Sequence, residues 1–268
     1  MDFTGPLFCL DFPKVKLYIC LFSCAVVRAV HLALTDSLSS ISFMLAFRRF
    51  VARRGMPSVL YSDNAQTFKG AEVQLQNQFG GCTPEWKYIV PKSPWWGGWW
   101  ERLVRSVKSG LRRSVAKRCL TKVELETTLV EIESCVNSRP LTFVGDEVDV
   151  VNPLSPSHFL VGKRLELQPR AVEDPESVSR DLLVDRANVR NEMLDRFWHV
   201  WQQNYLRNLP ASVAKFKSKG QLEVGSVVLV REDNMPRMKW ELAVVKKLYT
   251  SVDGYVRSVL LLYSGCMT

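Results

Sequence analysis

Acidic residues are the first candidates for chemistry in this chain, and four stand out by position: Asp2, Asp11, Asp63 and Glu101. Asp63 is the most informative, because it follows a short apolar stretch, residues 58–61, and precedes a turn. Open α/β sheets place functional groups at such strand ends, where side chains meet a crevice. An Asp that only caps a turn gives the same pattern, so this position alone leaves both interpretations open.

Glu101 begins a strongly basic segment. Arg105 and Lys108 follow it by four and seven residues, which places the three on one face of an expected helix. The charged residues that come after Glu101, up to position 122, are all basic: Arg102, Arg105, Lys108, Arg112, Arg113, Lys117, Arg118 and Lys122. One carboxylate before a row of cations suits an enzyme that binds a metal ion and follows a phosphate backbone. A solvated basic face is the alternative interpretation.

Asp2, within D-F-T-G-P, carries no signal alone, but it completes a set of three separated carboxylates with Asp63 and Glu101. Such a set suits hard, oxygen-ligated cations such as Mg²⁺ or Mn²⁺. Two such ions can activate an attacking hydroxyl and stabilise the leaving oxygen of an in-line phosphoryl transfer. The sequence therefore predicts a metal site that needs neither histidine nor cysteine.

The composition limits the class of protein. A net charge of +9 points to an anionic partner, nucleic acid foremost, although a soluble protein can also simply be basic. The seven cysteines are scattered without a C-x-x-C pair, which argues against a disulfide scaffold and a zinc site. The longest apolar run, residues 17–27, is too short to span a bilayer. We therefore expect an intracellular protein without a membrane segment.

The elements that must position these residues alternate between strands and helices. Residues 15–27 and 29–34 are β-rich with Arg28 between them, and the unbroken hydrophobicity of the first run predicts a strand covered on both faces. Asp36 or Ser37 can cap a helix that ends at Gly55, with Ile41, Met44, Leu45, Phe47, Phe50 and Val51 at helical spacing. The next expected elements are a strand at 58–61, a helix at 70–79, a strand at 85–90, and helices at 99–117 and 122–136. This order predicts a mixed α/β layer with helices on both faces.

The remainder of the chain changes character twice. Residues 145–179 are rich in proline and polar residues, which predicts a linker or surface wrap. Residues 181–209 predict a helix that carries Phe197, Trp198 and Trp201. Three β-rich runs between residues 222 and 262 predict a small barrel.

Several sequence motifs follow one another along nearly the whole chain: D-F-T-G-P (2–6), Y-I-C-L-F-S-C-A-V-V-R-A-V-H-L (18–32), F-R-R-F-V-A-R-R-G-M-P-S-V-L-Y-S-D-N (47–64), W-W-G-G-W-W-E (95–101), I-E-S-C-V-N-S-R-P-L-T (132–142), S-P-S-H-F-L-V-G (155–162), V-G-S-V-V-L-V-R-E-D-N-M-P-R-M-K-W (224–240) and D-G-Y-V-R (253–257). In these motifs and their order the sequence resembles integrases of long-terminal-repeat retrotransposons, most closely the BEL/Pao group.

The resemblance implies an α/β fold, with an RNase H-like mixed sheet flanked by helices followed by a small all-β SH3-like barrel. It implies a catalytic core at residues 1–142, a linker and helical connector at 143–215, and the SH3-like domain at 216–268. The implied activity is that of a polynucleotidyl transferase that processes the 3′ ends of DNA and performs strand transfer in DNA integration. Its partners would be element ends and target DNA, and the family suggests a homo-oligomer in the nucleus.

The resemblance also assigns site residues. The catalytic residues, which are also the ligands of two Mg²⁺ or Mn²⁺ ions, would be Asp2, Asp63 and Glu101. The DNA-binding residues would be Asn64, Lys92, Arg105, Lys108 and Arg112.

The sequence departs from the family at several positions. Ala65 stands where the family usually has glycine, and Trp96 stands where His-Phe or similar residues are common. The family has further residues of the first strand, and a histidine/cysteine zinc domain, before the position of Asp2, so we expect an N-terminally truncated core. Two alternatives follow: a catalytically inactive integrase remnant that binds nucleic acid, and a fragment that does not fold stably.

Overall fold

The computed structural model describes residues 1–79, 83–90, 98–115, 120–144, 152–165, 180–213, 222–230, 237–251 and 256–263 of the 268-residue chain. The contacts within the chain group its residues into two units, and each is described by itself. The first unit comprises Met1–Val136 and Ala171–Tyr205, and the second comprises Asn137–Arg170 and Leu206–Thr268.

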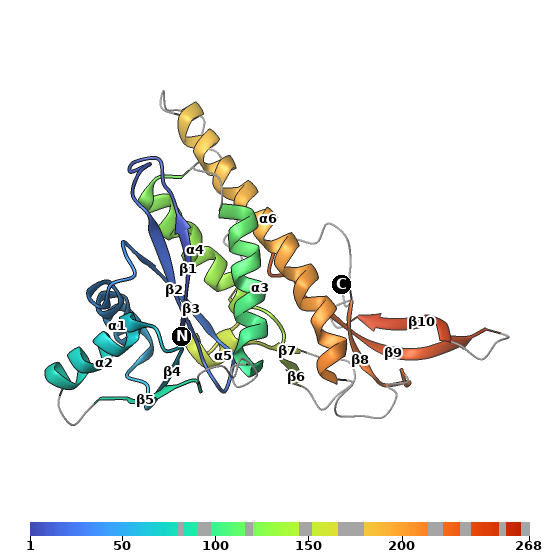
Figure 1. Cartoon of the computed structure of the whole chain (residues 1–268). Helices are drawn as coiled ribbons and strands as arrows, with labels where there is room; N and C mark the ends of the chain where they lie inside the picture. The colour runs from blue at the N-terminus through green and yellow to red at the C-terminus, as the bar shows by residue number, and fades with distance from the viewer. Residues whose placement is uncertain are drawn as a thin grey trace. The chain divides into compact units, whose positions relative to one another are not determined.

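The first unit contains an antiparallel sheet and a parallel pair of strands (Figure 1). The antiparallel sheet has the order β1-β2-β3, formed by β1 (Asp2–Leu7), β2 (Leu17–Ser23) and β3 (Val30–Thr35). The parallel pair consists of β4 (Val59–Ser62) and β5 (Glu85–Tyr88).

A hydrogen bond connects these two groups of strands. The amine nitrogen of Met1 donates to the carbonyl oxygen of Tyr61 in β4, at 2.6 Å. Since Met1 directly precedes β1, this bond holds β1 beside β4. The five strands therefore follow one another in the order β3-β2-β1-β4-β5.

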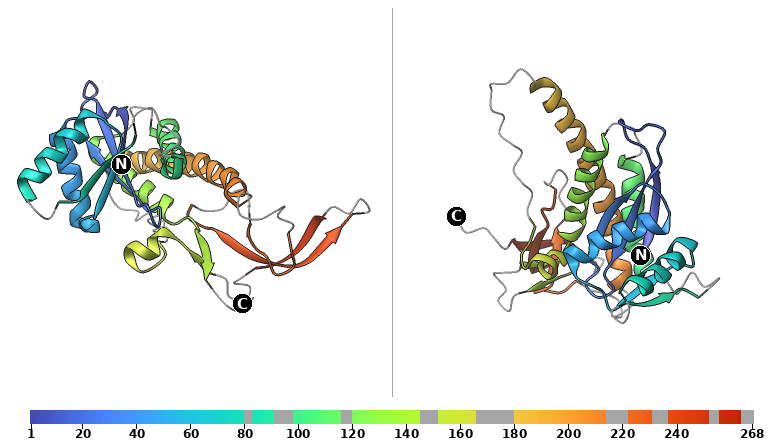
Figure 2. Two further views of the ribbon diagram at one scale, coloured as in Figure 1. Left: turned by 60° about the horizontal axis from the view of Figure 1, so that its bottom comes forward. Right: turned by 90° about the vertical axis from the view of Figure 1, so that its left-hand side faces the viewer.

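Helices cover both faces of the strands in the first unit. Figure 1 and the left view of Figure 2 show α1 (Ser40–Arg54) and α2 (Gln66–Phe79) on one side, and α3 (Gly98–Val115) and α6 (Arg180–Val213) on the other. The core beneath α1 and α2 is aromatic, and its buried members are Cys20, Phe22, Ala33, Phe43, Met44, Ala46, Phe47, Leu60, Phe68, Ala71 and Leu75. The mixed α/β layer with helices on both faces is confirmed.

Strands β2 and β3 of the antiparallel sheet are buried almost throughout. Every residue of β3 is buried, as is most of β2, so both faces of these strands are covered as their unbroken hydrophobicity predicted. The connection between them contains Arg28 in the left-handed region, with φ 57°. Arg28 therefore lies in the connection, where the sequence placed it, but β2 ends at Ser23 and residues 25–27 form a turn, although they were expected to belong to the strand.

The start of α1 differs from the expectation. Its N-cap is Ser39, whose side chain accepts a hydrogen bond from the Ser42 amide at 3.2 Å, and the cap is not Asp36 or Ser37. The hydroxyl of Ser37 instead contacts the hydroxyls of Ser39 and Ser42, at 2.9 and 2.8 Å. Ser39 therefore caps the first turn of α1, two residues after the predicted cap Ser37.

The buried face of α1 is also partly different. Phe43, Met44 and Phe47 are buried, but Ile41 and Leu45 are 67% and 54% exposed, although both were expected on the core face. Helical spacing identifies the residues that form an apolar stripe along the helix. When the stripe is wide, only the position of the sheet decides which of these residues are buried.

The other elements of the first unit lie close to the predicted ranges, with one early start. Helix α2 begins at Gln66 instead of residue 70, because the Asp63 carboxylate accepts the Ala65 amide at 3.1 Å and turns the chain directly into the helix. Helix α4 (Lys122–Asn137) agrees with its prediction to one residue.

The second unit begins with elements that sequence reasoning missed. The predicted linker contains β7 (Asn152–Leu154), which pairs antiparallel with β6 (Thr142–Val144), and the short helix α5 (Pro156–Val161). The helix starts at Ser155, whose amide donates to Nδ1 of His158 at 3.1 Å. Two of the prolines that suggested a linker, Pro156 and Pro153, stand at the first helical position of α5 and within β7, where a missing N–H is tolerated.

A three-stranded antiparallel sheet follows in the second unit. Its order is β10-β9-β8, formed by β8 (Val227–Val230), β9 (Glu241–Thr250) and β10 (Val256–Tyr263). Leu242 and Val244 of β9 form its buried cluster with Val227 and Leu229 of β8. The three β-rich runs are confirmed, and their closure into a barrel stays a prediction. Of the described helices, none has the length and apolarity needed to cross a membrane.

Candidate active site

Asp2 lies at the start of β1 with both carboxylate oxygens in use. Its Oδ1 accepts a hydrogen bond from the amide of Phe3 at 2.7 Å. Its Oδ2 forms an ion pair with the ammonium group of Lys108 on α3. The side chain remains 36% exposed, so solvent and a ligand can still reach it.

Asp63 directly follows β4 and is exposed. One carboxylate oxygen, Oδ1, accepts the Ala65 amide at 3.1 Å, and the other makes no hydrogen bond to a described residue. The preceding Ser62 is buried and fixes the backbone here: its hydroxyl donates to the carbonyl oxygen of Asp63 at 2.9 Å and accepts from Trp86 Nε1 at 2.9 Å. Asp63 therefore caps a turn and also presents a free oxygen to solvent.

The two carboxylates lie near each other although they are far apart in the sequence. The Met1–Tyr61 hydrogen bond places Asp2, one residue later, and Asp63, two residues later, at the same end of the β1–β4 pair. The pKa of the Met1 amine responds to the same residues. Burial lowers this pKa. The nearby Cys20, Asp2 and Asp63 raise it, and Lys108 lowers it further. Asp2, Asp63 and Lys108 thus all lie within electrostatic reach of one point.

Asn64 holds the loop that carries Asp63. Its side-chain amide donates to the carbonyl oxygen of Ile89, just beyond β5, at 2.8 Å. The neighbouring amide of Ile89 donates to the carbonyl of Ser62 at 3.1 Å. These two bonds tie the ends of β4 and β5 together, so the observed contact of Asn64 is with the protein's own backbone.

Helix α3 supplies the cations. Lys108 is half-buried against Asp2, whereas Arg105 and Arg112 are exposed. Position 101 lies two turns before Lys108 on the same helix face, about 10 Å along the axis at the α-helical rise. The side chain of Glu101 and the whole of Lys92 lie outside the described residues. Among the residues that are described, no three His, Cys, Asp or Glu side chains gather as a metal-binding group.

The position of α3 is fixed by its apolar side and by a glycine. Val104, Val107 and Leu111 are buried, as their spacing predicted. Gly110 lies so close to α6 that a Cβ atom there would approach the Phe197 ring to 2.7 Å. Since Phe197 is itself fully buried, α3 cannot move away without opening the core. Lys108 is therefore presented by a rigid element.

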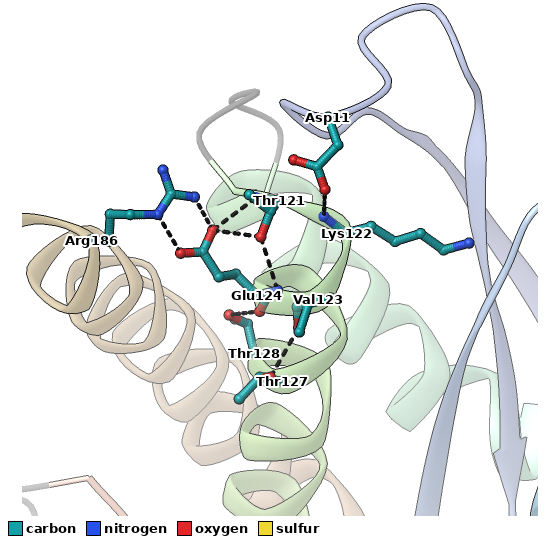
Figure 3. A network of polar contacts seen from close by, with 8 residues as sticks. All are labelled: Asp11, Thr121, Lys122, Val123, Glu124, Thr127, Thr128 and Arg186. Carbon is teal, nitrogen blue, oxygen red and sulfur yellow. Dashed lines mark hydrogen bonds and ion pairs between the residues drawn. The ribbon is translucent and has the colours of Figure 1, made fainter. Parts of the chain in front are cut away.

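Figure 3 shows a second polar network in this unit, at the start of α4. Glu124 accepts hydrogen bonds from the amide and the hydroxyl of Thr121, at 2.8 and 2.9 Å, and forms an ion pair with both guanidinium nitrogens Nε and Nη2 of Arg186 on α6. The hydrogen bond from Arg186 is the main reason that the pKa of Glu124 falls to about 2. The spacing T-x-x-E is that of a capping box, a signal for this helix start that is visible in the sequence.

A third network joins α1, β3 and α4 inside the unit. Glu133 is buried and accepts hydrogen bonds from the Leu32 amide at 2.9 Å and from Arg54 Nη2 at 2.7 Å, while His31 Nδ1 lies 3.1 Å from Oε2. No sequence signal pointed to Glu133, because its partners are distant in the chain and meet only in the fold.

Residues 185–267 match the model of a family described as a family of unknown function (DUF5641). No curated protein matches the chain.

Two solved structures of viral proteins are similar to this chain. One is a chain of the simian T-cell lymphotropic virus intasome in complex with PP2A regulatory subunit B56 gamma, with a TM-score of 0.40 and 16% identity over 65% of this chain and 59% of that chain. This chain therefore spans less than two thirds of the intasome chain. The other is the catalytic core domain of BIV integrase, with a TM-score of 0.38 and 16% identity over 60% of this chain and 91% of that chain.

Proposed function

We propose that the chain is a retroelement integrase of the BEL/Pao type, a metal-dependent polynucleotidyl transferase with an RNase H-like core and a C-terminal SH3-like barrel. The observation that carries the proposal is the convergence of Asp2, Asp63 and Lys108. They come from the start of β1, from the residue after β4 and from the middle of α3, and they meet at one end of the central strands. The mixed sheet with helices on both faces agrees with the fold that the sequence motifs suggest.

The donor set fits Mg²⁺ or Mn²⁺. Asp2 and Asp63 offer carboxylate oxygens at a solvent-accessible edge, which is the ligand type that hard divalent cations prefer. Glu101 is the proposed third ligand. When bound, two such ions activate the attacking hydroxyl and stabilise the leaving oxygen of a phosphodiester.

The remaining proposed roles belong to the chain's own cations and to Asn64. Arg105 and Arg112 are exposed on α3, where they can bind the phosphates of a DNA strand without reading its sequence. Lys92 is proposed to contribute another phosphate contact. Asn64, bonded to the Ile89 carbonyl, holds the loop that orients Asp63. Element ends and target DNA are the proposed substrates, and we propose that the protein acts as a homo-oligomer in the nucleus.

A strand-transfer assay on plasmid DNA with Mn²⁺ tests this proposal. Asp63→Asn should reduce joining by more than about 100-fold, because a lost metal ligand removes several kcal/mol of transition-state stabilisation. The matched control is Asp36→Asn, which removes an exposed carboxylate that pairs with Lys122, and it should join DNA like the wild type. Equal activity of the Asp63→Asn protein and the wild type would refute the assignment of the site.

A second function, nucleic-acid binding without catalysis, is favoured by a separate observation. Arg102, Arg112 and Arg113 are exposed on α3, so they are available to a polyanion whether or not the carboxylates bind metal. This function predicts DNA affinity that falls steeply with added salt, together with no joining by the wild type. Joining by the wild type that Asp63→Asn removes would exclude it.

A further inference from the structure

The contact between Lys108 and Asp2 has a consequence for metal binding. Lys108 has no other hydrogen-bond or ion-pair partner among the described residues, and its side chain is only 19% exposed. Asp2 Oδ1 is already bonded to the Phe3 amide, so the ammonium takes the oxygen that is not held by the backbone. Asp63, in contrast, keeps one carboxylate oxygen free of described partners.

An ammonium group at this position competes with a divalent cation. Two like charges about 4 Å apart repel each other, and the repulsion is several-fold stronger near a protein surface than in bulk water. A metal ion bound between Asp2 and Asp63 must therefore displace Lys108 or bear that repulsion. The lysine has a flexible four-carbon stem, so its ammonium can move to a phosphate while the rigid helix α3 stays in place.

We propose that Lys108 couples metal binding to DNA binding: it neutralises Asp2 in the absence of both ligands, and a DNA phosphate draws it away when the metal ion binds. The inference rests on the proposed function, because it needs a metal site at Asp2 and Asp63. Coupling between two ligands is reciprocal, so DNA raises the affinity for the metal by the same factor as the metal raises the affinity for DNA. Lys108 is then a positioning residue that keeps the metal site weak until the substrate is present.

The test measures binding of Mn²⁺ to the full chain from the signal of free Mn²⁺ in electron paramagnetic resonance, with and without a short DNA duplex. In the absence of DNA, Lys108→Gln should bind Mn²⁺ at least about five-fold more tightly than the wild type, because the competing cation is gone. The matched control is Arg113→Gln, which removes one exposed charge from the same helix. It should change the affinity for Mn²⁺ by less than about two-fold, since exposed charges are screened.

Addition of the DNA duplex provides the second readout. The wild type should bind Mn²⁺ at least about five-fold more tightly with DNA, and Lys108→Gln should gain much less. Lys108→Arg retains the positive charge and should restore the weak binding without DNA. The inference is overturned if Lys108→Gln and the wild type bind Mn²⁺ equally without DNA, or if DNA strengthens binding equally in both.

Asp63→Asn separates failure of the inference from failure of the proposed function. If the wild type binds Mn²⁺ and Asp63→Asn does not, the metal site exists, and the behaviour of Lys108→Gln decides the coupling alone. If the wild type binds no more Mn²⁺ than Asp63→Asn, with or without DNA, the metal site itself is absent. That result overturns the proposed function and the coupling together.

Discussion

The buried Glu133 and the surface pair Asp2 and Asp63 belong to the same unit, but they differ in how completely hydrogen bonds and ion pairs satisfy their carboxylate oxygens. Glu133 is 8% exposed and receives a backbone amide, an arginine and a histidine. Burial acts to raise the pKa of Glu133, but these hydrogen bonds outweigh it and hold the pKa below its usual value. Asp2 and Asp63 lie at the surface, and among the residues that the structure describes Lys108 is the only cation that forms an ion pair with either of them.

The difference separates a structural carboxylate from a candidate functional one. The partners of Glu133 come from α1 and β3, so its charge joins three elements and leaves no position for a ligand. Asp2 and Asp63 lie at one end of β1 and β4 with access to solvent, and Asp63 keeps one carboxylate oxygen without a described partner. We therefore expect Asp2 and Asp63 to contribute less to folding than Glu133 does.

The largest expected effect is on folding, at Glu133. Glu133→Gln should lower the free energy of unfolding by about 3 kcal/mol, because Arg54 loses its counter-charge and the hydrogen bonds of the carboxylate to the buried network are disrupted. Urea unfolding followed by circular dichroism measures the change. The matched control on the same helix is the exposed Glu126, whose Gln variant should lie within about 0.5 kcal/mol of the wild type. A Glu133→Gln protein as stable as this control would mean that the network does not support the fold.

An intermediate effect is expected at Glu124, which is partly exposed and paired with Arg186 (Figure 3). Its pKa is lowered in the folded protein to about 2 from a usual value of 4.5, so its stabilising contribution is complete above pH 4.5 and is lost as the pH falls toward 2. Glu124→Gln should therefore cost about 1 kcal/mol at pH 7, after allowance for solvent screening.

The pH dependence of the same variant provides its own control. The stability difference between the wild type and Glu124→Gln should shrink by more than half between pH 6 and pH 3, as measured by urea unfolding at both values. A difference that stays constant or grows as the pH falls would show that Arg186 does not hold the carboxylate in its charged form.

The smallest expected effect on folding is at Asp2. Asp2→Asn removes a solvent-accessible ion pair with Lys108, so the free energy of unfolding should change by less than about 1 kcal/mol. The same urea titration measures it. A loss as large as that expected for Glu133→Gln would remove the distinction between the two groups and make Asp2 a structural residue.

Much of the fold could be predicted from local patterns. The unbroken apolar run of β2, the apolar stripe of α3 and the β-rich runs of the second unit each lie where the sequence predicted them, because they depend on the periodicity of neighbouring residues. The errors have local causes too. Serine hydroxyls moved the cap of α1 to Ser39, and prolines hid β7 and α5 within a segment that resembled a linker.

The candidate site could be predicted only in part. Asp63 was recognisable from its place after a strand, whereas Asp2 was assigned by family resemblance alone. Asn64 was expected to orient its loop or to touch DNA, and the structure gives it a contact within the protein, with the Ile89 carbonyl. Glu133 was not predicted, because nothing near it in the sequence indicates that His31 and Arg54 would meet it in the core.

The sequence by itself determined three properties of this protein: three separated carboxylates, a helix whose charged residues after Glu101 are all basic, and the order of the strands and helices from β2 to α4. These properties depend on residue type and on spacing within single elements. Only the tertiary structure decided that Asp2 and Asp63 lie at one end of the central strands and that Lys108 reaches Asp2. The physical reason is that the burial of apolar surface over the whole unit sets the strand order and the helix packing. The positions of the charged side chains follow from that packing.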